Sequence, residues 1–414
     1  MKLIKTSFYT SISTSVTFIS GFIVTKFVAV KIGPSGITYV GQYQNVIAIL
    51  AMLSTLAITT GVIKYLAEHT GEKQKKEQII NTALIIVLIA SCIISLFVFT
   101  ASSFLSTIVF HSNNFSDVFF LYGFFVTIIA LNTLIASVYN GLKEIRYLTA
   151  INISGSLTGI VFTVLFAYKL GVKGVLIANN FTAFIIFIIN ITILYKKKYF
   201  SLKPTFKKWN RKVGNQLFGF TIMGIVSGIV NPVSQIMIRN KIIITFSANE
   251  AGWWQAVTRI SDYYLAFITT VLTIYYLPRL SEIKNKAELK HEVVKGYKII
   301  LPVVGSMAFM LWLCKIWVVH ILFSKEFLPM TPLFTFQLLG DFFKIGSWLL
   351  AYVLVAKAAI KVIIVAELLF SICFVFLSYL LIGKFGIIGA TYAFSINYML
   401  YWITMFLFTK KYLN

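Results

Sequence analysis

Long apolar runs alternate with short polar segments along the whole chain. Residues 79–110 and 213–238 form two of the longest runs, and neither contains a charged side chain. A helix needs about 20 apolar residues to cross a bilayer, so runs of this length predict membrane-spanning helices. We predict an all-α polytopic membrane protein with twelve transmembrane helices, at approximately 8–30, 41–63, 79–103, 118–141, 148–168, 174–195, 216–238, 252–276, 297–321, 331–355, 361–382 and 386–408.

The predicted helix 252–276 carries a polar stripe within its long apolar stretch. Gln255, Arg259 and Asp262 recur at steps of four and three residues, so they share one helix face. A charged side chain at the centre of a bilayer costs about 3 kcal/mol on insertion scales. We therefore expect the stripe to face protein or a water-filled cavity rather than lipid.

The predicted helix 331–355 carries a second stripe, in which Gln337, Asp341 and Lys344 fall on one face. Two interpretations stay open. In the first, the charges of each helix form neutral pairs that only fix helix packing. In the second, they line a hydrated cavity, where the cations hold an anionic substrate and an acid responds to ion binding. The candidates for substrate binding are then Gln255, Arg259, Gln337 and Lys344, and those for ion coupling or charge pairing are Asp262 and Asp341.

Two further charges lie nearer the ends of their predicted helices. Lys26 is close enough to the outer end of helix 8–30 to reach the interface, or to contact a substrate there. Glu367 lies near the inner end of helix 361–382, where an interfacial position and a functional one are equally compatible with the pattern. Lys26 is therefore a further candidate for substrate binding, and Glu367 for ion coupling or charge pairing.

The distribution of basic residues sets the predicted orientation. With the N-terminus inside, the inner loops and tails hold 26 of the 37 Lys and Arg residues and the outer loops hold 7. Because cytoplasmic loops are enriched in these residues, both termini are expected in the cytoplasm. The same loops account for the net charge of +24 without nucleic acid, and we expect them to contact anionic membrane lipids.

A basic segment at 196–215 divides the chain into two predicted six-helix lobes, 1–195 and 216–414. The lobes repeat weakly in the same order, which fits a parallel duplication. The matching segments are YVGQYQ (39–44) with EAGWWQ (250–255), and GVKGVLIA (171–178) with GIIGATYA (386–393).

No sequence pattern indicates covalent or metal chemistry. Cys92, Cys314 and Cys373 lie in apolar segments, which predicts free, packed thiols. The chain has no HExxH, CxxC, P-loop or GxSxG motif. We therefore expect no enzyme activity, no cofactor and no metal site, and any uphill transport must draw on an ion or substrate gradient.

With these residues in view, the sequence resembles the Wzx-type O-antigen and enterobacterial common antigen (lipid III) flippases of the MOP exporter superfamily. The resemblance runs nearly end to end. The segments that carry it are TKFVAVKIGPSGI (25–37), GVIKYLAEH (61–69), WWQAVTRISDYYLAFIT (253–269), YYLPRLSEI (275–283), LFSKEF (322–327), FQLLGDFFK (336–344) and VAKA (355–358).

The resemblance implies two six-helix lobes around a central cavity that opens alternately to each side of the bacterial inner membrane. The implied substrate is an undecaprenyl-diphosphate-linked repeat unit of O-antigen or common antigen, moved from the cytoplasmic to the periplasmic leaflet. A proton or sodium ion, a glycan polymerase and a chain-length regulator are the expected partners. Arg259 departs from the common antigen flippases, which have a small polar residue there, and this points to a different glycan. The positions that match the family pattern are Lys26, Asp262, Asp341 and Lys344.

Two other functions compete with a flippase. A MATE-like drug or cation antiporter would share the fold, but a cationic substrate favours a net acidic cavity, and here four cations face three acids within the predicted helices. A glycan polymerase or ligase would need a sizeable outer loop with catalytic groups, and the predicted outer loops are short.

Overall fold

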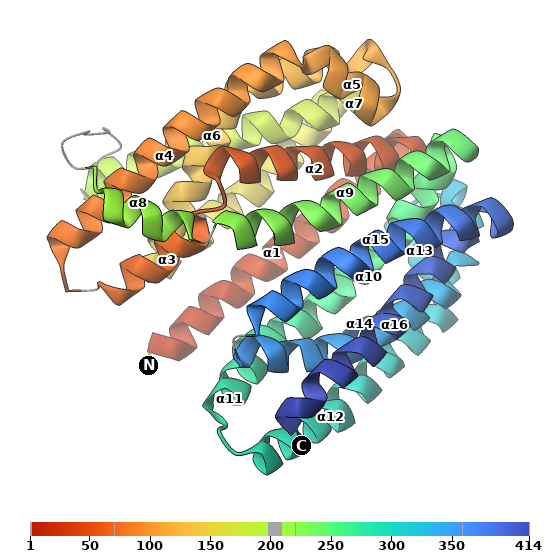
Figure 1. Ribbon diagram of the computed structural model, residues 1–414. Coiled ribbons are helices and arrows are strands. Elements are labelled where there is room, and N and C mark those ends of the chain that lie inside the picture. Colours follow the sequence, from red (N-terminus) through yellow and green to blue (C-terminus); the bar gives the residue numbers. More distant parts are fainter. Residues whose placement is uncertain (1, 70, 198–208, 220, 358, 414) are drawn as a thin grey trace. The chain divides into compact units, whose positions relative to one another are not determined.

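The computed structural model is helical through the residues it describes, which are 2–69, 71–197, 209–219, 221–357 and 359–413 (Figure 1). Helices pair their own backbone groups, which a bilayer interior without water requires. Among the described residues, seven helices are long and apolar enough to cross a membrane, or up to eight if one bent pair is a single span. The all-α membrane fold is confirmed, whereas the count of twelve spans and the cytoplasmic termini stay predictions.

The chain forms two compact units, and the three boundaries between them each fall inside a helix. Unit 1 comprises Met1–Val28 and Tyr39–Pro232, and unit 2 comprises Ala29–Thr38 and Val233–Asn414. The predicted lobes 1–195 and 216–414 and their linker at 196–215 stay predictions, and residues 198–208 of that linker lie outside the described residues.

Unit 1 is built around α4 and α6. Apolar side chains of these two helices, among them Leu84 and Leu134, pack with Val62 of α3 and Leu217 of α8 in one buried cluster. Its helices are α1 (Lys2–Lys31, which ends in unit 2), α2 (Pro34–Thr55, which begins in unit 2), α3 (Thr59–Glu68), α4 (Lys73–Thr100), α5 (Ser102–Phe110), η1 (Asn113–Phe115), α6 (Ser116–Gly141), α7 (Ile145–Lys197), α8 (Arg211–Phe218) and α9 (Thr221–Thr245, which ends in unit 2).

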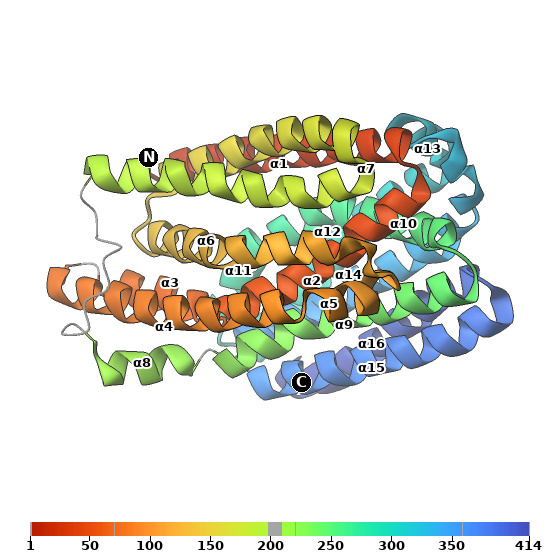
Figure 2. The same cartoon turned by 90° about the horizontal axis from the view of Figure 1, so that it is seen from above.

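Unit 2 is built around α14, which packs against α16, α12 and α10. Figure 2 shows α15 running beside α16. The helices of this unit are α10 (Ala248–Val271), η3 (Leu272–Tyr276), α11 (Leu277–Glu282), α12 (Lys286–Leu313), α13 (Lys315–Leu322), η4 (Lys325–Met330), α14 (Leu333–Ala356), α15 (Ile360–Phe385) and α16 (Ile388–Leu413).

Four predicted helices are wrong as single straight elements. The predicted helix 297–321 is divided at Cys314 between α12 and α13, and the predicted helix 216–238 covers the end of α8 and most of α9. The predicted helix 41–63 is split into α2 and α3, which meet at 48°, because Leu56 and Ala57 take left-handed φ values of 48° and 51°. The predicted helix 252–276 changes from α to π geometry at Leu272, and the backbone N–H of Leu277 donates to Leu272 O. Pro278 follows directly, and a proline ring crowds the carbonyl one turn before it, which a wider turn relieves.

Each unit has a sharp helix break that is formed by two glycines three residues apart. Gly171 in α7 and Gly386 between α15 and α16 both have positive φ, at 55° and 69°. Three residues later, Gly174 and Gly389 pack so closely on a carbonyl of the preceding helix, Phe166 O or Leu381 O, that a Cβ would overlap it. Both pairs come from the repeated motif at 171–178 and 386–393, so the structure supports a duplication of this helical hairpin.

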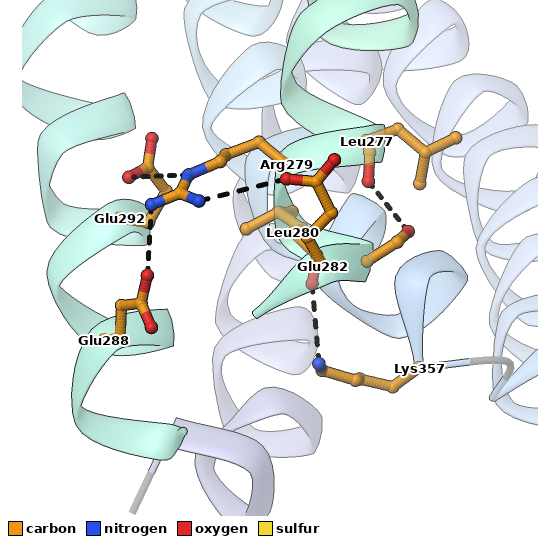
Figure 3. Close-up of polar contacts among 8 residues, drawn as sticks. Leu277, Arg279, Leu280, Glu282, Glu288, Glu292 and Lys357 are labelled. Atoms are coloured by element: carbon orange, nitrogen blue, oxygen red, sulfur yellow. Dashed lines mark hydrogen bonds and ion pairs between the residues drawn. The ribbon is translucent and has the colours of Figure 1, made fainter. Parts of the chain in front are cut away.

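A charged network holds the loop between α11 and α12 of unit 2 (Figure 3). The Arg279 guanidinium lies 3.0 Å from the carboxylate of Glu288, 3.7 Å from that of Glu292 and 3.9 Å from that of Glu282. Lys357, just after α14, donates from Nζ to the carbonyl oxygens of Ile283 (2.6 Å) and Leu280 (3.4 Å) at the end of α11. Arg279 therefore ties α11 to α12, and Lys357 ties α11 to α14.

Candidate functional site

Asp341 of α14 lies at the centre of a polar cluster in unit 2. Its side chain is fully buried. Its Oδ2 accepts hydrogen bonds from the hydroxyls of Ser261 (2.6 Å) and Tyr264 (2.9 Å), which lie three residues apart on one face of α10. These two bonds fix the register of α10 on α14 and hold the carboxylate in one orientation.

The other side of this carboxylate has polar atoms without protein partners. Gln337 lies one turn before Asp341 on α14. Asp341 Oδ1 and the amide oxygen and nitrogen of the Gln337 side chain are buried and have no hydrogen-bond partner among the described residues. A buried polar atom left unpaired costs about 1–3 kcal/mol, so native proteins normally satisfy such atoms with water, an ion or a ligand. The face of α14 that carries Gln337 and Asp341 is thus suited to bind a water molecule, an ion or a small polar ligand.

Lys344 lies one turn after Asp341, within a set of aromatic rings. Its Nζ is 5.1 Å from the ring centre of Trp348, 5.6 Å from that of Tyr398 and 5.9 Å from that of Phe394. Rings at these distances stabilise an ammonium group through their negative faces. The lysine also interacts electrostatically with Asp262 and Asp341, so it is held by aromatic rings and acids together.

The polar stripes of α10 and α14 come together through Asp262. This acid interacts electrostatically with Lys344 of α14 and with Arg259, which precedes it by three residues on α10. Asp262 is exposed, whereas Arg259 and Lys344 are half-buried. The charges therefore form one cluster shared by two helices rather than two separate intrahelical pairs. That this cluster lines a hydrated cavity stays a prediction.

Gln255 lies one turn before Arg259 and is buried against α9. Its Oε1 accepts a hydrogen bond from Arg239, whose guanidinium lies 5.8 Å from the ring centre of Trp254. The predicted spans 216–238 and 252–276 place Arg239 and Lys241 in an outer loop between them. The prediction of a loop at these two residues is wrong, because α9 continues to Thr245 through the apolar residues Ile242, Ile243 and Ile244.

Two further candidates are Lys26 and Glu367. Lys26 is half-buried in α1 and belongs to unit 1, whereas the cluster belongs to unit 2, and its role as a substrate contact stays a prediction. Glu367 of α15 interacts electrostatically with Tyr398 and Tyr401 of α16. Since Tyr398 also borders Lys344, Glu367 lies on the second layer around that lysine.

Sequence reasoning missed the residues that contact the charges from neighbouring helices. Ser261 and Tyr264 hold Asp341, and Phe394 and Tyr398 of α16 surround Lys344. Only Trp348 carried a local signal, since it follows Lys344 by four residues and so shares its helix face. The described residues include no group of three or more His, Cys, Asp or Glu side chains that could hold a metal ion.

The chain is similar in sequence to a known protein family and to characterised relatives. Residues 3–284 match the family described as polysaccharide biosynthesis protein. The chain belongs to this family. This family member is 31% identical over 403 residues to the Lipid III flippase of Escherichia coli (strain K12), covering 97% of the chain and 96% of the relative. The Lipid III flippase of Shigella flexneri matches to the same extent.

Solved structures show that the fold of this family member is that of MOP-superfamily transporters. An inward-facing MATE family multidrug resistance transporter matches with a TM-score of 0.79 at 14% identity, over 97% of this chain and 94% of the other. An outward-facing MATE transporter matches with a TM-score of 0.72 at 13% identity, over 100% and 95%. The protein is a multi-pass protein of the inner membrane.

Proposed function

We propose that this protein is a flippase that moves an undecaprenyl-diphosphate-linked oligosaccharide from the cytoplasmic to the periplasmic leaflet. The observation that carries the proposal is the likeness to Lipid III flippases over 97% of the chain. The cluster of Arg259, Asp262, Asp341 and Lys344 supports it chemically, because a diphosphate cannot cross hydrocarbon at acceptable cost without cations to balance its charge. In this proposal the protein is a carrier that opens alternately to each side, and not an enzyme.

Arg259 and Lys344 are the proposed head-group cations. Arg259 offers a planar set of donors that matches phosphate oxygens, and Lys344 offers a compact charge already oriented by three rings. Gln255 and Gln337 are the proposed neutral contacts beside them, and Lys26 is a proposed outer contact on unit 1. The polymerase and chain-length regulator remain expected partners.

Asp341 is the proposed centre of ion coupling, with Asp262 and Glu367 as supporting acids. Its Oδ1 and the Gln337 amide are buried without protein partners among the described residues, and oxygen ligands of this kind suit a sodium ion or a shared proton. Binding of a positive ion there weakens the hold of the acids on Lys344, since each acid attracts the same ammonium group. The ion gradient would thus act on Lys344 through Asp341, which lies about one helical turn away on the same helix.

Reconstitution tests this function directly. Purified protein is placed in liposomes with an undecaprenyl-diphosphate-linked sugar in one leaflet, and transfer is followed with a membrane-impermeant reagent that modifies the sugar. The wild type should speed transfer over empty liposomes, and the double variant Arg259→Ala, Lys344→Ala should not. A wild type without activity, or full activity in the double variant, excludes this mechanism.

A MATE-like antiporter remains the second candidate, because solved MATE transporters share the fold. Sequence identities of 13–14% to these transporters support a common fold but do not indicate a common substrate. An organic cation needs an acid free to receive it, whereas Asp262 and Asp341 here already face Lys344. Drug efflux that depends on Asp341, with no transfer of lipid-linked sugar, would favour this alternative.

A further inference from the structure

Arg239 is a fully buried cation that the proposed head-group site does not use. Only 1% of its surface is exposed. It lies on α9 about 9 Å from the C-terminal end of that helix, and Gln255 lies about 10 Å from the start of α10. Since only Phe246 and Ser247 connect the two helices, this short hairpin places Arg239 and Gln255 opposite each other.

The contacts of Arg239 determine how the Gln255 amide is turned. The guanidinium donates to Gln255 Oε1 while it lies over the Trp254 ring. A guanidinium has only donors, so it can meet the oxygen of an amide but not its NH2 group. The NH2 group of Gln255 is therefore directed away from Arg239.

The direction of that NH2 group matters because of Arg259. Gln255 and Arg259 are four residues apart and share one face of α10, so their side chains are neighbours. Arg239 and Arg259 also repel each other electrostatically. A buried cation such as Arg239 near the half-buried Arg259 is costly in the free protein, and a doubly negative group bound at Arg259 would relieve that repulsion.

We propose that Arg239 is a positioning residue of the head-group site: it locks the Gln255 amide so that its NH2 group and Arg259 face the diphosphate together. The second positive charge makes this part of unit 2 selective for two negative charges over one. This inference rests on the proposed function and assigns a selectivity determinant to its site.

Gln255→Glu separates this role from a merely structural one. A carboxylate at position 255 keeps a partner for Arg239, and indeed a stronger one, so the hairpin should stay folded. The same change removes the NH2 donor and neutralises one positive charge. If Arg239 only pins α9 to α10, Gln255→Glu will transport as the wild type does. If it positions a donor, transport will suffer although the protein is as heat-stable as before.

The experiment measures transfer in liposomes with two probes, polyprenyl-diphosphate-linked and polyprenyl-monophosphate-linked N-acetylglucosamine. For Gln255→Glu we expect the half-saturating concentration of the diphosphate probe to rise about tenfold or more, as for loss of a hydrogen bond to a charged group. The half-saturating concentration of the monophosphate probe should change less. The ratio between the two half-saturating concentrations, which measures the preference for the diphosphate, should therefore become smaller. Arg239→Lys, which keeps a donor and a charge, should retain more of that preference than Arg239→Met.

The possible results distinguish this inference from the function on which it rests. If the wild type moves neither probe, the flippase proposal fails and this inference fails with it. If the wild type moves the diphosphate probe and Gln255→Glu does so with unchanged half-saturation and unchanged preference, the role of Arg239 and the proposed contact of Gln255 are overturned, and the flippase function stands.

Discussion

The two units share a backbone design but bury different side chains. Each contains the same glycine pair at a sharp helix break, Gly171 with Gly174 and Gly386 with Gly389. Among the described residues, however, every buried charged side chain lies in unit 2, namely Arg239, Glu292 and Asp341. The buried polar side chains of unit 1 are neutral, as at Asn190 and Tyr139.

This difference separates the requirements of the fold from those of the function. Removing a charge from water costs several kcal/mol even after relaxation. Unit 1 builds its helices around neutral buried groups, so the architecture itself does not require buried charge. Glu292 is paired with Arg279 in the loop network, but the charges at and around Asp341 are better explained by a ligand than by folding. Substitutions in that cluster can be compared with matched substitutions elsewhere in the chain.

Lys344→Met should have the largest effect. It removes the proposed head-group cation and leaves Asp262 and Asp341 without the positive charge that both face. Transfer of the lipid-linked sugar should fall about a hundredfold, near the upper limit for a hydrogen bond to a charged group. The liposome assay, corrected for protein abundance, measures this fall.

Lys315→Met is the matched control for that variant. Lys315 also belongs to unit 2 and also lies over an aromatic ring, with Nζ 5.1 Å from the centre of Trp312. The same substitution there should leave transfer close to the wild-type rate. Equal losses at both lysines would mean that any cation over a ring matters, and would remove the case for a special cluster.

Tyr264→Phe should have the next largest effect. The hydroxyl of Tyr264 donates to Asp341 Oδ2 at 2.9 Å, and its removal leaves the buried carboxylate with Ser261 as its remaining described donor. A hydrogen bond to a charged group contributes about 1.5–3 kcal/mol, so transfer should fall about tenfold. Dependence of transfer on an imposed proton or sodium gradient should change as well. Wild-type coupling in this variant argues against Asp341 as the ion site.

Features that follow from the helical repeat of about 3.6 residues can be predicted from the sequence. Gln255, Arg259 and Asp262, and likewise Gln337, Asp341 and Lys344, share helix faces because steps of three and four residues place them there. The glycine repeat was also visible, because identical backbone geometry needs glycine at the same positions. Features that depend on a single helix could thus be predicted without the structure.

Contacts between helices could not be predicted in this way. Whether Ser261 and Tyr264 meet Asp341 depends on how far α10 is shifted along α14, and no local pattern specifies that shift. The sequence predicts a loop at Arg239 because a charge after an apolar run is an ordinary end signal for a spanning helix. Its burial depends on Gln255 and Trp254, which come from the next helix.

Arg279→Met should have a modest effect on stability rather than transport. Arg279 pairs with three glutamates, of which Glu292 keeps only 10% of its side chain exposed. Because the other partners are exposed and screened by solvent, we expect a loss of only about 1 kcal/mol of unfolding free energy. The fraction of protein that stays soluble after heating, measured by size-exclusion chromatography, should fall, and high salt should reduce the difference.

Lys64→Met in unit 1 is the counterpart of that variant. Lys64 lies 3.6 Å from Glu68, but both side chains are about half exposed, at 51% and 48%. Such an exposed pair one turn apart contributes about 0.3–0.5 kcal/mol. A heat sensitivity in Lys64→Met as large as that of Arg279→Met would show that the extra glutamates of the unit 2 network add nothing.

Tyr139→Phe should have the smallest effect and makes the sharpest comparison with Tyr264→Phe. Tyr139 of unit 1 is fully buried, but its hydroxyl has no hydrogen-bond partner among the described residues. Its ring packs at 5.6 Å on that of Tyr147, and phenylalanine keeps this contact. Removing a buried hydroxyl that has no partner among the described residues breaks no hydrogen bond, so heat stability should stay unchanged. Transfer should stay within about twofold of the wild-type rate. The two variants delete the same oxygen, so a large loss in Tyr264→Phe with none in Tyr139→Phe locates the function in the charged cluster of unit 2, and equal losses would contradict that conclusion.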